Sequence, residues 1–232
     1  MSSMLVTQPS EDQRLPSGED VVVLHPVSWS TFNCLLQELG DSRGQRLTYC
    51  DEWLEIMSPL GIHEHSNRFI EGLIFVMADE LNLPLKRFGS LTLKLDNYQQ
   101  GVEPDSCYYL HHESEVRRKQ NIDLTVDPPP DLVLEIDISR PSIEKLPIYA
   151  NLQVPEVWRY RNDALWVFVL EAETGEYRQV EASPTFPFLP LDQVPLFIQR
   201  SLVIGETATL KEFRQWVRDH ANYEGDFGGG AD

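Results

Sequence analysis

Apolar residues recur at two different spacings along the chain, and the spacing predicts which segments are helices and which are strands. The longest helical pattern covers 63–84, where apolar residues are three and four positions apart: Phe69, Ile70, Leu73, Ile74, Met77 and Leu81. A shorter helix is predicted over 28–40, with Ser28 as N-cap and Gly40 as terminator. Two further amphipathic segments, 142–153 and 209–225, complete the predicted helices.

Alternating apolar and polar residues predict strands and hairpins elsewhere. Residues 46–59 alternate around Asp51-Glu52, and residues 156–174 do so around Asn162-Asp163, so each segment predicts a β-hairpin. The remaining predicted strands are 21–26, 89–95, 101–110, 132–138 and 175–183. This order of elements predicts an α/β (α+β) fold, in which helices flank a hairpin-rich mixed β-sheet.

The ends of the chain differ in composition from its centre. We expect a flexible N-terminal arm over 1–20, a single domain over 21–225 and a flexible tail over 226–232. The apolar runs are too short to span a bilayer, the first twenty residues lack the features of a secretory signal, and three scattered cysteines suggest no disulfide framework. These features predict a cytoplasmic protein without a membrane partner.

The segment "LVLEIDI", residues 132–138, places two carboxylates in an apolar strand. Glu135 and Asp137 are two residues apart, so they face one side of the strand, while Leu134, Ile136 and Ile138 face the other. Two neighbouring ionised carboxylates are costly near a core unless a cation or a hydrogen-bond network compensates them.

A second pair of acids, Glu103 and Asp105 in "VEPDSCYY", has the same spacing, although Pro104 between them is unusual inside a strand. If the two strands are neighbours, carboxylates converge from both, and these hard oxygen ligands suit Mg²⁺ or Mn²⁺. Lys145 follows Glu135 by ten residues and could fold back over the strand end. The alternative is a surface strand with solvated acids and a solvated lysine.

The segments "GVEPDSCYYL" and "PPPDLVLEIDISRPSIEKLPIYANLQVPEVWRY" together resemble the Uma-type family of putative bacterial restriction endonucleases, formerly a domain of unknown function. That family is similar to the PD-(D/E)XK nuclease superfamily in fold and motif layout. "WLEIMSPLGIHEH", "GSLTLK" and "FRQWVR" also look like family landmarks, so the likeness extends over most of the chain.

The resemblance implies a restriction-endonuclease-like fold and roles for particular residues. Asp105 matches the aspartate of the motif and Glu135 its second acid, and both would be metal ligands. The motif lysine would fall at position 137, which here is Asp137, and the resemblance makes Lys145 its match. Asp137 could then be an extra ligand, a partner for Lys145 or the mark of an inactive site.

The start of the long helix matches another segment of the family. Glu64 is implied as a further metal ligand, and His63 and Glu103 are candidates for supporting the ligands from outside the metal's coordination shell. Zinc is a weaker alternative, because His63 and His65, two positions apart on a helix, diverge.

The predicted function is hydrolysis of DNA phosphodiester bonds with Mg²⁺ (or Mn²⁺), by a homodimer that matches the two-fold symmetry of duplex DNA. A net charge of −18 opposes nucleic-acid binding unless bound ions reverse the local sign. The rivals are a catalytically inactive nuclease-fold protein that acts as a binding or regulatory module, and a purely structural acidic protein. The compact basic run Arg117, Arg118 and Lys119 is a hypothetical phosphate contact.

Overall fold

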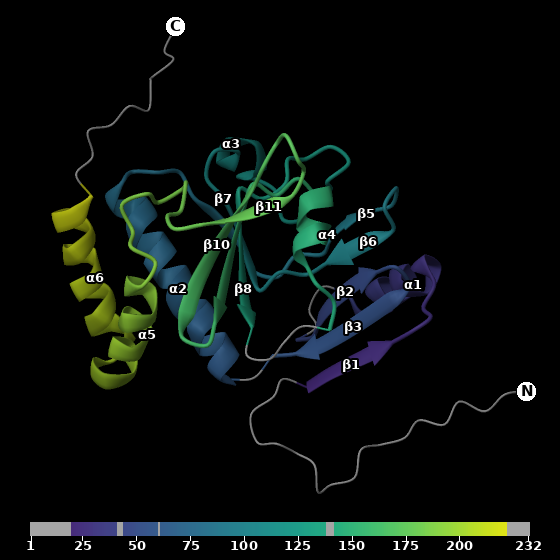
Figure 1. Cartoon of the computed structure of the whole chain (residues 1–232), viewed down its shortest axis with the longest axis horizontal. Helices are drawn as coiled ribbons and strands as arrows, with labels where there is room; N and C mark the ends of the chain where they lie inside the picture. The colour runs from purple at the N-terminus through teal and green to yellow at the C-terminus, as the bar shows by residue number, and fades with distance from the viewer. Residues whose placement is uncertain (1–19, 41–43, 60, 138–141, 222–232) are drawn as a thin grey trace, which may run out of the picture.

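The computed structural model describes residues 20–40, 44–59, 61–137 and 142–221 (Figure 1). The predicted arm over 1–20, apart from Asp20, and the predicted tail over 226–232 lie outside these residues, as does Ile138. The described helices are α1 (Trp29–Leu39), α2 (Gly61–Glu80), α3 (Glu113–Val116), α4 (Leu146–Asn151), α5 (Gln193–Ile204) and α6 (Glu206–His220). The described strands are β1 (Asp20–Leu24), β2 (Arg46–Cys50), β3 (Trp53–Ser58), β4 (Lys86–Phe88), β5 (Leu93–Leu95), β6 (Gln100–Val102), β7 (Ser106–Tyr109), β8 (Leu132–Asp137), β9 (Glu156–Arg161), β10 (Ala164–Leu170) and β11 (Tyr177–Val180).

The fold is a mixed α/β arrangement, which confirms the predicted class, but the described strands form two sheets where one was expected. A five-stranded antiparallel sheet has the order β1-β3-β2-β6-β5. A six-stranded sheet has the order β11-β10-β9-β8-β7-β4, in which β8 and β9 are parallel and the other pairs are antiparallel. Whether the whole of 21–225 is one domain stays a prediction.

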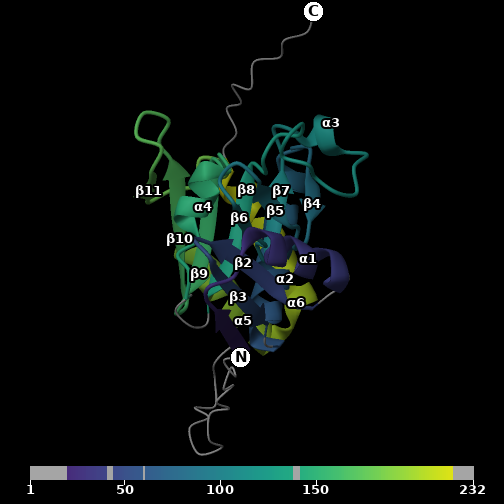
Figure 2. The ribbon, with the colours of Figure 1, turned by 90° about the vertical axis from the view of Figure 1, so that its right-hand side faces the viewer.

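Helices cover the two sheets unequally. α2, α5 and α6 pack together against one face of the six-stranded sheet, and α4 lies against its other face (Figure 1). Figure 2 looks onto the five-stranded sheet and shows α1 lying across it, where Phe32 packs on Tyr49 and Leu54. β8 is therefore covered on both faces, which explains why all six of its residues are buried.

Local signals set the boundaries of several elements. The Ser28 hydroxyl accepts a hydrogen bond from Thr31 N at 3.2 Å and caps α1, as predicted. Asp51-Glu52 and Asn162-Asp163 all adopt positive φ, so the two predicted hairpins close through two-residue turns whose twist suits paired strands. α2 ends at Glu80 rather than at the predicted residue 84, because Asn82 turns into the left-handed region.

Two segments predicted as single strands differ in the structure. Of the predicted strand 89–95 only Leu93–Leu95 is a strand, β5, and the unpredicted β4 precedes it and joins the other sheet. In place of 101–110, β6 ends at Val102 and β7 begins at Ser106, because Pro104 cannot donate to a strand ladder and the chain crosses between sheets there. This second crossing, residues 103–105, carries the acid pair.

Other boundaries also differ from the prediction. α4 has six residues instead of the twelve expected over 142–153, and α6 begins three residues earlier than position 209. α5 was not predicted, although its Pro195 lies in the first turn, where proline is tolerated. Tertiary packing against α2 and α6 decides this segment.

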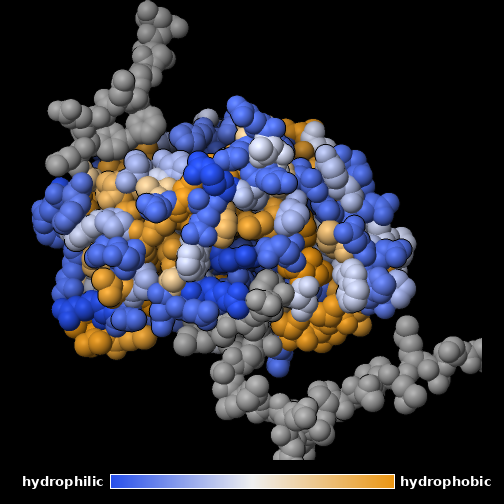
Figure 3. Space-filling model, in the orientation of Figure 1, coloured by the Kyte–Doolittle hydropathy of each residue, from blue (hydrophilic) through white to orange (hydrophobic). Residues whose placement is uncertain are grey.

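Two groups of apolar side chains remain exposed at the surface. One is β1, where Val21, Val22, Val23 and Leu24 are all exposed, and the other is on α5, where Leu202 and Val203 are exposed. The hydrophobic areas along the lower edge of Figure 3 lie over these two elements. Among the described residues, no helix is both long enough and apolar enough to cross a membrane.

Candidate active site

The crossing between the sheets places Asp105 beside Glu135. β7 and β8 pair antiparallel with Ser106 opposite Leu134, so the residue just before β7 lies opposite Glu135. Asp105 Oδ2 accepts a hydrogen bond from Ile136 N at 2.8 Å, which fixes its carboxylate against β8. The two acids predicted as metal ligands are therefore neighbours, and both are 1% exposed.

The strand β8 alternates as its sequence predicts. Leu134 and Ile136 belong to the core under α2, while Glu135 faces α4. There Lys145 Nζ donates a hydrogen bond to Glu135 Oε2 at 2.7 Å, and the Tyr149 hydroxyl donates to Glu135 Oε1. Lys145 and Tyr149 are four residues apart at the start of α4, so one face of a short helix covers the glutamate.

Burial and neighbouring charges act in opposite ways on the two acids. Burial, together with the charges of Asp105 and Asp137, raises the pKa of Glu135 to about 7 against the lowering effect of Lys145. Burial alone would also raise the pKa of Asp105, but His63, Lys145 and the Ile136 amide outweigh it and lower that pKa. Near neutral pH, Asp105 is an anion and Glu135 is at its midpoint of ionisation.

Asp137 has a cation of its own. Its Oδ2 lies 2.9 Å from Arg159 Nε, which is close enough for an ion pair, although the angles are not those of a hydrogen bond. Arg159 also contacts Glu144 at 2.8 Å, while the hydrogen bond of Lys145 goes to Glu135. Burial raises the pKa of Asp137 more than these cations lower it.

The remaining predicted residues approach the site from other elements. His63 is fully buried at the start of α2, with its Nε2 3.2 Å from Asp105 Oδ2. Glu64 is one third exposed and contacts Arg46 and Arg68, so its role as a ligand stays a prediction. Glu103 points away from Asp105, toward Leu47 N at 2.9 Å and the Thr92 hydroxyl, because the chain turns at Pro104.

Comparison with known proteins gives the relationship of the chain. The model of the Uma2 family, described as "Putative restriction endonuclease", matches residues 29–202. The chain belongs to the Uma2 family. A crystal structure of a putative nuclease of the DUF820 group from Anabaena variabilis ATCC 29413 is 15% identical to it, over 75% of this chain and 99% of the other, with a TM-score of 0.48. No curated protein matches the chain.

This Uma2 chain offers the oxygen ligands that a divalent ion prefers. Asp105 Oδ1 and Asp137 Oδ2 are buried and accept no hydrogen bond within the described part of the chain. No group of three or more His, Cys, Asp and Glu side chains there is arranged to hold an ion. Mg²⁺ keeps several waters and takes only one or two protein carboxylates, so Asp105 with Glu135 fits it, and Asp137 is a further candidate.

Sequence reasoning missed three residues that contact these acids: Arg46, Tyr149 and Arg159. Tyr149 could have been found from the sequence, since it lies four residues after Lys145 and therefore on the same face of the predicted helix. Arg159 alternates with Trp158 and Tyr160 in β9, and the parallel pairing of β9 with β8 places it in register with Glu135. Arg46 had no such signal, because its place depends on how the two sheets meet.

A buried acid of β3 fixes the segment that leads to Lys145. Glu55 is 4% exposed, and its Oε2 accepts a hydrogen bond from Ser142 N at 2.7 Å. This bond joins residues 87 positions apart in sequence and holds the start of the segment that ends at Lys145.

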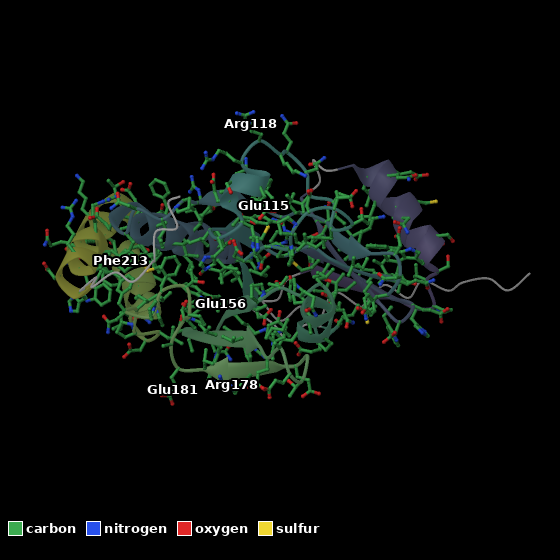
Figure 4. The ribbon with its side chains drawn as sticks, turned by 90° about the horizontal axis from the view of Figure 1, so that it is seen from above. Glu115, Arg118, Glu156, Arg178, Glu181 and Phe213 are labelled. Atoms are coloured by element: carbon green, nitrogen blue, oxygen red, sulfur yellow. The ribbon has the colours of Figure 1, made fainter. Side chains whose placement is uncertain are left out.

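The basic run lies elsewhere on the molecule. Arg117 is paired with Glu113 at 2.6 Å, Lys119 is paired with Asp127, and Arg118 projects from the surface beside α3 (Figure 4). Two of the three cations already hold carboxylates, and a phosphate contact by this run stays a prediction.

Proposed function

We propose that this protein is a metal-dependent endonuclease that hydrolyses phosphodiester bonds in DNA. The observation that carries the proposal is the pairing of Asp105 and Glu135 across two strands, with Lys145 hydrogen-bonded to the glutamate. Membership of a family described as "Putative restriction endonuclease" supports the same reaction class.

Each residue has a role that follows from its contacts. Asp105 and Glu135 would hold Mg²⁺ or Mn²⁺, which when bound supplies an acidified water and offsets the charge on the phosphate. The Lys145 ammonium lies beside Glu135. There it would orient the attacking water or stabilise charge on the phosphoryl oxygens. Tyr149 donates to Glu135 and holds that carboxylate in one orientation.

Cleavage of supercoiled plasmid tests the proposal. The purified protein is incubated with Mg²⁺, with Mn²⁺ and with EDTA, and the same assay is run on Asp105→Asn and Glu135→Gln, which keep the size of each side chain. We expect nicked and linear products from the wild type with either metal and none from the two variants. Cleavage that persists in both variants would show that these acids are not the ligands.

The catalytically inactive binding module remains the second candidate, and one observation favours it. The acids are already compensated by cations of the protein itself, since Lys145 neutralises Glu135 and Arg159 neutralises Asp137. A folded wild type that binds DNA but leaves plasmid intact with every metal would support this candidate. The homodimer and the cytoplasmic location stay predictions.

A further inference from the structure

Arg46 is a cation at the candidate site that forms no hydrogen bond to a carboxylate in the described structure. It begins β2, and its side chain is 11% exposed. Its Nε lies 3.9 Å from Asp105 Oδ1 and its Nη2 lies 3.7 Å from Glu64 Oε1, both beyond the range of a hydrogen bond. The hydrogen bond that it does make runs from Nη1 to Gly44 O at 3.3 Å.

The side chains of Arg46 and Asp105 face each other without a hydrogen bond between them. Arg46 Nε is buried and has no hydrogen-bond partner among the described residues, and the same is true of Asp105 Oδ1 facing it. A buried donor or acceptor without a partner costs free energy. An anion with several oxygen atoms would accept from the guanidinium fork, whose planar geometry matches phosphate.

A cavity opens at Arg46. It has a volume of about 190 Å³, and its wall holds the neutral hydrogen-bonding side chains of Gln45, Ser90, Thr92 and Asn121 beside the apolar Leu91 and Ile122. The Glu103 carboxylate in its wall is occupied by Leu47 N and the Thr92 hydroxyl. A second cavity of about 630 Å³ shares Thr92 and Ile122 with the first and includes Lys94. The two adjoining cavities therefore hold cations at Arg46 and Lys94, with the carboxylates of Asp96 and Asp123 also in the wall of the second.

Two other cations near the acids contact carboxylates, and Arg161, in register with Asp137, is a third cation beside them. Lys145 donates to Glu135, and Arg159 contacts both Asp137 and Glu144. A chain with a net charge of −18 repels DNA at long range, so a contact with its backbone requires a locally available cation. Arg46 meets this requirement beside Asp105.

We propose that Arg46 binds a non-bridging oxygen of the DNA phosphodiester at the site, and that the joined cavities receive the strand that continues from it. This inference rests on the proposed function, because it assumes that the phosphodiester lies against Asp105 and Glu135. Arg46 would bind the phosphate through the terminal amino groups of its guanidinium, since Nε is buried, and the neutral side chains of the adjoining cavities would contact sugar and base edges.

Equilibrium binding of a fluorescein-labelled DNA duplex tests the role of Arg46. Anisotropy titrations over a series of salt concentrations compare the wild type with Arg46→Gln and Arg46→Lys, in EDTA and in Ca²⁺. We expect Arg46→Gln to weaken binding about tenfold and to reduce the slope of log K against log salt by about 1. Arg46→Lys restores the slope but not the full affinity, because it keeps the charge and loses the fork.

The matched control is Arg178→Gln. Arg178 is an exposed arginine on β11 that pairs with Glu171, at the opposite edge of the six-stranded sheet (Figure 4). We expect its affinity and salt slope to equal those of the wild type, and far-ultraviolet circular dichroism verifies that each variant is folded. Wild-type affinity and slope in Arg46→Gln would overturn the inference.

The cleavage and binding assays separate this inference from the proposed function. Arg46-dependent DNA binding in a wild type that never cleaves plasmid supports the inference and contradicts the endonuclease. Metal-dependent cleavage by the wild type, with unchanged DNA binding by Arg46→Gln, supports the endonuclease and contradicts the role of Arg46. A wild type that binds no duplex in either buffer overturns both.

Discussion

Glu156 and Glu135 are both buried glutamates on neighbouring strands of one sheet, yet their surroundings differ in kind. Glu156 accepts from neutral donors: Trp158 Nε1 at 2.6 Å, Ser183 Oγ at 2.6 Å, and the amide and hydroxyl of Thr185 at 3.2 and 2.5 Å. It pairs in register with Leu132, three residues before Glu135, and its bonds tie the segment after β11 to β9. Its burial is explained by the fold alone.

Glu135 lies among charges instead. Lys145 is its cation, Asp105 and Asp137 are further anions beside it, and each of these two has a buried oxygen that accepts no hydrogen bond from the described residues. Repulsion among such carboxylates is costly and stabilises nothing in the fold. The comparison shows that burial of an acid does not indicate function, whereas a buried cluster of acids with unused oxygen atoms does.

The largest stability effect should come from removing the cation of Glu135. Lys145→Met leaves a buried carboxylate without its partner, and we expect it to lower the free energy of unfolding by about 4 kcal/mol at pH 7.5. Urea denaturation measures this value. Adding Glu135→Gln removes the orphaned charge and should recover more than half of the loss. A double variant no more stable than Lys145→Met would contradict the ion-pair account.

Glu156→Ala should cost somewhat less stability and leave the chemistry intact. It removes the acceptor of four hydrogen bonds, so the free energy of unfolding should fall by about 3 kcal/mol. At a temperature where the variant is folded, metal binding and plasmid cleavage should equal those of the wild type. A variant that keeps its stability but loses cleavage would place Glu156 in the active site. It would contradict the claim that Glu156, unlike Glu135, has a purely structural role.

The pH dependence of stability gives a smaller effect with a definite sign. The pKa of Glu135 is about 7 in the folded protein and about 4.5 in the unfolded chain, so the folded state binds the extra proton between these values. Without metal, the free energy of unfolding should therefore fall by about 2 kcal/mol from pH 5 to pH 8. Asp137 adds a contribution of the same sign, because burial raises its pKa as well. The lowered pKa of Asp105 acts below this window.

Urea titrations in EDTA at several pH values measure this dependence. Glu135→Gln cannot ionise at that position and should remove most of the decline. The difference between wild type and variant isolates Glu135 from the other titrating groups. A wild type whose stability relative to Glu135→Gln rises from pH 5 to pH 8 would contradict the raised pKa.

Local pattern predicted much of the fold, and the exceptions share one cause. The hairpins around Asp51 and Asn162, the cap at Ser28 and the alternation of Glu135 with Ile136 depend on residues close in sequence, and all were predicted. The two sheets, the strand breaks and α5 depend on packing between distant segments. Alternation predicted a strand through Pro104 but could not show that the chain changes sheets there.

The residues of the candidate site also divide into those that the sequence predicts and those that only the folded structure brings together. Asp105, Glu135 and Lys145 were predicted from the sequence and its family resemblance, and the structure brings them together. Tyr149 follows from helix spacing once Lys145 is placed. Glu55 lies in the landmark segment 53–65 but had no predicted role, and Arg46 lies in none of the quoted segments; the meeting of the two sheets brings both toward the site. Glu103 has the same spacing as Glu135 and Asp137, but the turn at Pro104 removes it from the group.

Anomalous diffraction from crystals soaked in Mn²⁺ tests the central claim most directly, because it locates the ion without reference to activity. The account predicts one strong peak within bonding distance of Asp105 and Glu135 in the wild type, and its loss in Asp105→Asn. Soaked crystals of Glu156→Gln should keep the peak. A peak elsewhere, or no peak at the two acids at saturating Mn²⁺, would contradict the claim that these carboxylates are gathered to hold a divalent ion.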